Sequence, residues 1–308
     1  MPGFRSILPL IFNRFAAQLS AVLVAGLLLS PAASAQWFGS ATIEALGSDN
    51  VSRAPLEIYA EEDQSLQASA SGGYHWQIAD YTGLELQGSL QRQQSLRFAS
   101  LSNTRLAASA VLSHKFGLGE RAPTLSLTSA IERSSYNNSL RNASTWTGSL
   151  NYRQRLTDRL SIGLGAGYEQ QDGDHSQPKP AVPPALPLPG DVWDTDAVTL
   201  NANAELDLDA ASWLSASLGY RTGDTVASTQ PRPFILAEST AVVFDSAFAP
   251  GFVAYRLDTR SRAIALDWNR ALSDSATLYV GIERQFTHSD RGLSYRTNFV
   301  RTGLIYSF

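Results

Sequence analysis

Alternating apolar and polar residues constrain the fold of this chain more than any other feature of its sequence. From Val198 to Leu208, every even position is Val, Leu or Ala, and every odd position is Thr, Asn, Glu or Asp. Residues 84–91 and 160–169 follow the same period of two. Successive side chains of a β-strand point to opposite faces of a sheet, so this period predicts strands with one apolar and one polar face.

The alternating segments are long. They run to about ten residues or more, which is the length that a tilted strand needs to cross a bilayer, whereas strands of soluble domains usually have about five or six. Short and long connections also alternate, which is typical of membrane barrels with tight periplasmic turns and larger outer loops. We therefore predict an all-β fold, a transmembrane antiparallel up-and-down β-barrel.

The expected barrel has twelve strands, with ten as the alternative if the first pair is misread. The expected strands span residues 37–47, 64–78, 83–95, 103–116, 123–136, 144–156, 159–170, 194–208, 212–224, 256–271, 276–288 and 294–308. An unpaired backbone group in hydrocarbon costs several kcal/mol, so the first and last strands are expected to pair. Aromatic residues of the apolar face fall at both strand ends, as membrane interfaces favour: Trp37, Trp76, Tyr152, Trp268 and Tyr306 at the periplasmic ends, and Trp146, Tyr168, Tyr220 and Phe286 at the outer ends.

The first residues have the pattern of an export signal. Arg5 and Arg14 supply positive charge, residues 15–29 are mostly apolar, and Ala33-Ser34-Ala35 matches the A-x-A cleavage pattern. Residues 1–35 are therefore predicted to be a cleaved signal peptide, and residues 36–308 a single transmembrane β-barrel domain.

Composition excludes several classes of protein. The chain has no cysteine, which rules out disulfides, thiolate zinc sites and cysteine nucleophiles. Without the signal peptide it carries 22 basic and 28 acidic residues, a net charge of −6, whereas nucleic-acid-binding proteins favour basic stripes. Nucleic acid is therefore not an expected partner, and no motif indicates a metal ion or a cofactor.

The last strand carries a second signal. Arg301, Gly303, Tyr306 and Phe308 place a polar residue, a glycine and two aromatic residues in a fixed register at the C-terminus. This register resembles the terminal assembly signal of the bacterial outer-membrane β-barrel protein superfamily, and no specific family within it is indicated. The resemblance covers only the final strand. It implies recognition of this strand by the barrel-assembly machinery. Together with the export signal and the alternating strands, it leads us to expect a protein of the bacterial cell outer membrane that contacts outer-membrane lipid.

The polar face of the strands is expected to line the lumen. Charged candidates for this lining are Glu85, Arg105, Glu132, Arg153, Arg155, Glu169, Glu205, Asp207, Arg221, Asp267, Glu283 and Arg301, together with Glu44 and Lys115. These are eight acids and six bases, so neither sign dominates. The inward glycines at 163, 165 and 167 indicate either free lumen volume or strong sheet curvature, and the sequence does not separate the two.

Three functions are compatible with such a barrel. The first is a narrow passive channel for small hydrophilic solutes, in which the partly apolar loop at 225–255 folds inward as a constriction. The second is a structural or interaction barrel that displays this loop and the Pro-rich loop at 171–193 for adhesion or envelope assembly. The third is a hydrolase built on His288, Ser289 and Asp290, which is disfavoured because adjacent residues of an extended chain point apart. We therefore expect a non-enzymatic protein.

Overall fold

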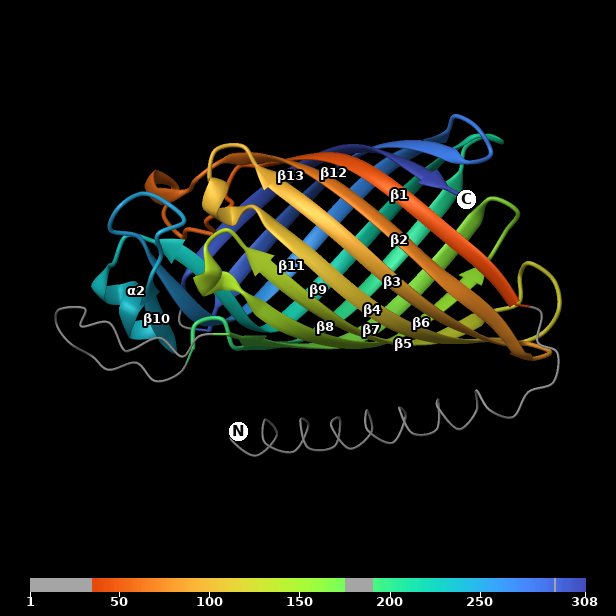
Figure 1. The fold of residues 1–308 in the computed structure, drawn as a ribbon, viewed down its shortest axis with the longest axis horizontal. Coiled ribbons are helices and arrows are strands. Elements are labelled where there is room, and N and C mark those ends of the chain that lie inside the picture. Colours follow the sequence, from red (N-terminus) through yellow and green to blue (C-terminus); the bar gives the residue numbers. More distant parts are fainter. Residues whose placement is uncertain (1–34, 175–190, 291) are drawn as a thin grey trace.

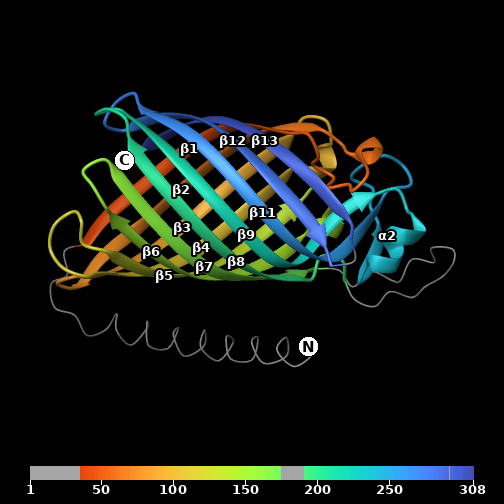
Figure 2. The ribbon, with the colours of Figure 1, turned by 180° about the vertical axis from the view of Figure 1, so that it is seen from behind.

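The computed structural model describes residues 35–174, 191–290 and 292–308, and in these ranges the chain forms one antiparallel sheet that closes into a barrel (Figures 1 and 2). The barrel wall of the described chain has twelve long strands: β1 (Ala35–Ser48), β2 (Asp63–Ala79), β3 (Thr82–Ser95), β4 (Asn103–Lys115), β5 (Thr124–Tyr136), β6 (Ala143–Arg155), β7 (Leu160–Gly173), β8 (Thr195–Asp207), β9 (Ser212–Thr229), β11 (Val253–Ala271), β12 (Ala276–Ser289) and β13 (Ser294–Ser307). The predicted fold is confirmed, and the ten-strand alternative is wrong.

Two predictions fall largely or wholly outside these ranges. The predicted signal peptide lies outside the described residues apart from Ala35, the first residue of β1, and so does the Pro-rich stretch of the loop at 171–193. Among the residues that the structure does describe, no helix is long and apolar enough to cross a membrane.

The barrel closes between its first and last strands, as predicted. β1 and β13 pair over residues 40–48 and 299–307. Gly39 and Phe308 extend this ladder, because each donates its N–H to the carbonyl oxygen of the other, at 2.9 and 3.0 Å. A Cβ atom on Gly39 would collide with the Phe308 ring, so glycine lets the terminal ring lie across the first strand. A closed wall leaves no sheet edge in the hydrocarbon.

The outward face of the wall is apolar along its middle. Ile43 is 67% exposed, Ile131 59% and Leu164 55%, although each lies within a paired strand. Soluble monomers rarely expose apolar patches of more than a few hundred Å², so a band around the whole barrel requires lipid as its surroundings. At the end of the barrel with the short turns, Trp37, Tyr74 and Trp76 form edge-to-face ring contacts and contribute to the aromatic belt.

At the other end, two strands extend beyond their neighbours. The β8–β9 ladder stops at Gly223 and the β11–β12 ladder stops at Thr259, yet residues 224–229 and 253–258 continue to pair with each other. β10 (Ala241–Phe244) adds to the free edge of β11, and the short helix α2 (Pro233–Glu238) precedes it. The predicted strand limits of 224 and 256 were therefore too short, because the extensions interrupt the regular alternation.

A matched pair of substitutions on β3 tests which face meets the lipid. Leu90 is outward and 53% exposed, whereas Gln87 has the opposite parity. Leu90→Arg is expected to lower the free energy of unfolding by about 2–4 kcal/mol, the cost of a cation near the middle of the bilayer. Gln87→Arg should change it far less, and urea unfolding in phospholipid vesicles measures both. Equal losses would contradict the assignment of the faces.

Candidate functional site

The inner wall of the barrel is crossed by ion pairs. In the described chain, ten of the fourteen charged residues of the predicted lumen lining form five pairs with one another: Arg105–Glu132 at 3.9 Å, Arg153–Glu205 at 3.3 Å, Arg155–Asp207 at 3.1 Å, Arg221–Glu169 at 3.4 Å and Arg301–Asp267 at 2.8 Å. Each pair neutralises one acid with one base, so this part of the wall is nearly neutral. Each pair also joins two strands, which holds its charges in fixed positions.

Most of these pairs pass over an intervening strand. Asp267, Gly281 and Arg301 lie in one row across β11, β12 and β13, and the guanidinium donates from Nε and Nη2 to the two carboxylate oxygens at 2.8 Å each. A Cβ atom on Gly281 would overlap the Asp267 carboxylate. The glycine therefore provides the space in which this bidentate pair forms.

The glycines of β7 also give space to inward polar side chains of the neighbouring strands. Arg153 and Arg155 of β6 reach Glu205 and Asp207 of β8 by passing over β7. Asparagine side chains of the same two neighbouring strands lie over the glycines, since a Cβ atom on Gly163 would collide with Asn203. The sequence left open whether these glycines indicate free lumen volume or strong sheet curvature. In the structure, polar side chains of adjacent strands occupy the space that the glycines leave.

Four residues of the predicted lining remain outside these pairs: Glu44, Glu85, Lys115 and Glu283. Glu85 and Glu283 form no ion pair with any residue of the described chain. Near Glu283, the Tyr279 hydroxyl donates to Glu44, which places a third carboxylate in a hydrogen bond rather than an ion pair. These carboxylates give the inner wall its small excess of negative charge.

The outer end of the barrel is covered by residues 224–258, which we call the cap (Figure 1). Phe248 of the cap packs on Phe98 with ring centroids 5.0 Å apart, and Phe98 belongs to the β3–β4 loop. Four strands separate β9 and β11 from β3 and β4 in either direction around the wall. The cap must therefore span the mouth to make this contact, so the 225–255 loop lies over the end of the barrel. The predicted inward constriction stays a prediction.

The cap is attached to several other loops of this rim. Ser228 donates its N–H to the Ser52 carbonyl of the β1–β2 loop at 2.8 Å. Arg256 donates to the Asp191 carbonyl, before β8, at 2.9 Å. Leu293 of the β12–β13 loop packs on the cap core. The cap is thus held around the circumference of the mouth rather than at one hinge.

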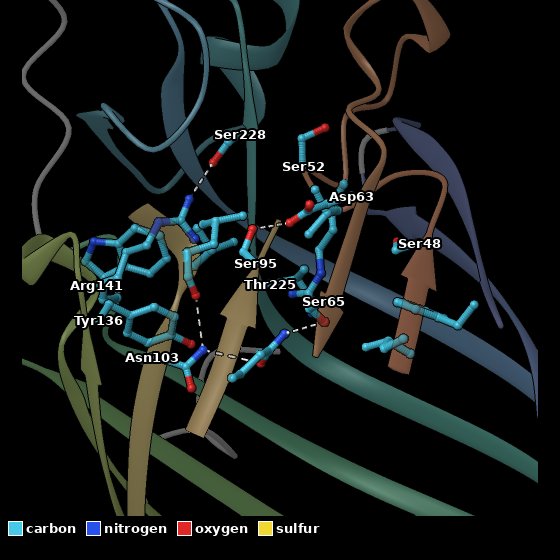
Figure 3. Close-up of a pocket in the computed structure, with 18 of the residues that line it drawn as sticks. Ser48, Ser52, Asp63, Ser65, Ser95, Asn103, Tyr136, Arg141, Thr225 and Ser228 are labelled. Atoms are coloured by element: carbon cyan, nitrogen blue, oxygen red, sulfur yellow. Dashed lines mark hydrogen bonds between the residues drawn. The ribbon is translucent and has the colours of Figure 1, made fainter. Parts of the chain in front are cut away.

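Arg141 is the polar centre of this arrangement (Figure 3). It follows β5 in the 3-10 turn η3 (Ser139–Arg141), forms an ion pair with Asp245 and donates to Ser228 at 3.4 Å. Its guanidinium also lies over the Trp193 ring, 4.6 Å from the centroid. The side chains of Arg141 and Asp245 are only 14% and 1% exposed, so this ion pair is shielded from solvent.

Apolar packing completes the cap. Ile235 of α2 is fully buried against Val253, Tyr255 and Leu257 of the β11 extension. Burial raises the pKa of the Tyr255 hydroxyl above its ordinary value, so it stays neutral. Most of the apolar residues that make this loop unusual in sequence therefore pack within the core of the cap itself.

Beneath the cap lies a cavity of about 540 Å³ inside the outer end of the barrel (Figure 3). Neutral polar side chains form much of its lining, among them Ser65, Gln93, Asn103, Gln171, Thr225 and Gln285. Three of the predicted lumen residues, Arg105, Glu169 and Arg221, also line it. Hydrogen bonds order the wall: Gln93 donates to Ser65 at 3.1 Å and Asn103 to the Leu101 carbonyl at 3.1 Å.

Some residues of this cavity were not predicted from the sequence. Asp224 lines it at the base of the cap, where burial raises the pKa of its carboxyl; Asp196 and Asp258 add to the rise, and Arg256 opposes it. Arg141 and Asp63 also line the cavity. All three lie outside the regular alternating segments or at their ends, so no periodic signal marked them.

The geometry at His288 does not support hydrolysis. Ser289 donates its hydroxyl to Glu238 of α2, and Asp290 forms an ion pair with Arg260 at 3.2 Å. His288 is exposed on the outward face and has no hydrogen bond to either neighbour. These three residues therefore have separate partners or surroundings, as expected for adjacent positions of an extended strand.

No protein-family model matches the chain, and no curated protein matches it. An outer membrane channel from Pseudomonas putida F1 superposes with a TM-score of 0.56 at 14% identity, covering 91% of this chain and 97% of that one. The KdgM porin in complex with disordered oligogalacturonate gives 0.43 at 13%, over 87% and 99%. The outer membrane channel DcaP of Acinetobacter baumannii gives 0.45 at 9%, over 90% and 97%. The superposition on the Pseudomonas putida F1 channel and the closed twelve-stranded wall show that the chain has the fold of a bacterial outer-membrane β-barrel.

Proposed function

We propose that this protein is a narrow passive channel that carries small hydrophilic solutes across the bacterial outer membrane. The observation that supports it most directly is the polar cavity of about 540 Å³ at the outer end of the lumen, directly below the cap. A cavity lined by amide and hydroxyl groups favours water and polar solutes, because those groups would lose hydrogen bonds to an apolar molecule. The similarity in fold to the outer membrane channel from Pseudomonas putida F1 is consistent with this proposal.

The paired charges of the inner wall support passage rather than tight binding. A solute that meets Arg301 or Arg153 finds each guanidinium already bound to a carboxylate. A neutral, hydrated wall allows polar solutes to leave as readily as they enter. The charged residues predicted for the lumen, with Arg105, Glu169 and Arg221 nearest the cap, form the lining in this proposal.

The cap supports a restricted opening. It spans the mouth and holds Arg141 and Asp245 in a shielded ion pair, so solutes must pass around it or displace it. The alternative of a barrel that displays its loops loses the part of its motivation that came from the apolar loop, because Ile235, Val243 and Phe252 are buried within the cap. Phe234 and Phe244 remain about half exposed, which is a small surface for a partner.

Removing the cap tests the channel directly. Thr229 and Val253 face each other in the β9–β11 ladder, so an Asn-Gly turn can replace residues 230–252 without changing the register. The purified full-length protein should give discrete conductance steps in a planar bilayer, and the shortened variant should give steps several-fold larger. Asp245→Asn, which removes one charge of the buried pair, should give an intermediate conductance. Absence of steps from both the intact and the shortened barrel would contradict a pore.

Ion selectivity tests the predicted lining. With eight inward acids and six bases, the pore should be weakly cation-selective. Glu85→Gln with Glu283→Gln removes this excess and should move the reversal potential in a KCl gradient towards zero. Asp80→Asn with Asp274→Asn, two carboxylates in short turns, is the charge-matched control and should have a smaller effect. A stronger effect of the control would place the ion path elsewhere.

We also infer that the C-terminal strand is recognised by the barrel-assembly machinery through Gly303, Tyr306 and Phe308. Tyr306 is 51% and Phe308 74% exposed, so both rings are accessible from outside the barrel. Deleting Phe308 should lower the amount of heat-modifiable barrel in cell envelopes. Refolding of the same purified variant in detergent should remain efficient; an equal loss there would indicate a role in stability alone.

A further inference from the structure

A group of arginines faces outward from the barrel near its outer rim. Arg262 of β11, Arg284 of β12 and Arg296 of β13 lie on the same outward face as the lipid-facing aliphatic residues and are all exposed. They surround Phe286, which is 39% exposed. We call these three arginines and Phe286 the rim patch.

Strand register brings the three cations close together. Phe286 pairs with Arg262 on one side and with Arg296 on the other. Arg284 lies two residues from Phe286 on the same strand, so it is a diagonal neighbour of both other arginines, at roughly 7–8 Å between backbones. Three like charges at this spacing repel one another unless an anion lies between them.

The charges nearest the membrane lack carboxylate partners. Within the described chain, neither Arg262 nor Arg284 forms an ion pair, although Arg296 pairs with Glu57 at 3.3 Å. Arg284 instead lies over the Phe286 ring, 5.0 Å from its centroid, which holds its guanidinium on the outer surface. The nearest carboxylates have other partners: Asp49 lies in the row of Arg284 but accepts hydrogen bonds from Asn298 between them, and Glu57 pairs with Arg296.

The rim patch lies at the boundary of the apolar band. On the side towards the periplasm, the next outward residues after Arg262 and Arg284 are Ile264 and Ile282, and on β13 Asn298 separates Arg296 from Val300. Ile264, Ile282 and Val300 are each more than half exposed. Tyr220, a residue of the predicted outer aromatic belt, pairs with Arg262. Aromatic belts mark the headgroup level, so the arginines face headgroups rather than acyl chains.

A hollow of about 550 Å³ adjoins the patch on the outward surface. Phe286, His288 and Arg296 line one side of it, and Pro55 and Ala60 of the β1–β2 loop line the other. Asp49 and Glu57 also reach it, but Asp49 accepts hydrogen bonds from Asn298 and Glu57 pairs with Arg296. The hollow thus has a mixed lining of apolar, polar and carboxylate groups, which suits a sugar rather than a phosphate, and Arg262 and Arg284 lie beside it rather than in it.

From this arrangement we propose that the rim patch binds a phosphate-bearing glycolipid of the outer leaflet. The planar guanidinium groups of Arg262 and Arg284 match phosphate oxygens in bidentate geometry. The hollow accommodates the sugar part of the headgroup, and the exposed Ile264 and Ile282 receive the first acyl carbons. Binding relieves the repulsion between Arg262 and Arg284, neither of which forms an ion pair within the described chain.

The experiment compares lipid binding by two charge-matched variants. Arg262→Gln with Arg284→Gln removes two charges from the patch, while Arg92→Gln with Arg133→Gln removes two outward-facing arginines elsewhere on the rim, on β3 and β5. Each purified full-length protein is titrated in detergent with diphosphorylated lipid A, and bound lipid is counted by native mass spectrometry. The patch variant should bind about tenfold more weakly than wild type, and the control should match wild type.

Two further arms separate the lipid from other ligands. Dephosphorylated lipid A should bind the wild-type protein as weakly as diphosphorylated lipid A binds the patch variant. Millimolar inorganic phosphate should not displace the lipid; displacement would show a free-anion site and overturn the proposal, as would equal binding by the two variants. Single-channel conductance of the patch variant should equal that of wild type, so this result is independent of the proposed pore.

Discussion

The structure depends on one constraint: backbone amides in hydrocarbon must find partners within the protein. In water an unpaired N–H costs little, but in a bilayer each one costs several kcal/mol. Pairing β1 with β13 satisfies the groups that an open sheet would leave unpaired. The constraint acts on the backbone alone, so the side chains of the two faces can differ in polarity. Because successive side chains of a strand point to opposite faces, this difference gives the sequence its period of two.

Closure then imposes its own condition on the interior. The wall curves, and inward side chains of alternate strands approach one another over the strand between them. Where that strand carries glycine, as at Gly281, long side chains such as Arg301 and Asp267 meet across it. Gly281 therefore makes room for an ion pair, and the inward glycines of β7 make room for asparagine side chains. A wall of fixed, nearly neutral pairs interacts with many polar solutes weakly, which suits a passive channel.

The sequence was sufficient for features that repeat with the strand period and insufficient for those that do not. Strand number, the faces and the inward set follow from parity, since each inward residue is two positions from the next. Parity cannot name partners, so the pairing of Arg153 with Glu205 across β7 was not foreseen. Arg141 and Asp245 lie in non-periodic loops and meet only because the cap spans the barrel, a contact between strands that are distant in the chain.

The two uses of arginine in this molecule show how surroundings decide what a charge does. Arg141 is shielded by the cap, and its guanidinium has a carboxylate, a hydroxyl and an aromatic ring as partners. A buried cation without a partner would strongly destabilise the fold, so Arg141 needs this network as long as the cap shields it from solvent. Arg262 and Arg284 lie at the interface, where water and headgroups reduce that cost and a protein partner is not required. In the proposal, the partner of Arg262 and Arg284 is therefore a lipid phosphate from the membrane, whereas all partners of Arg141 named above belong to the protein.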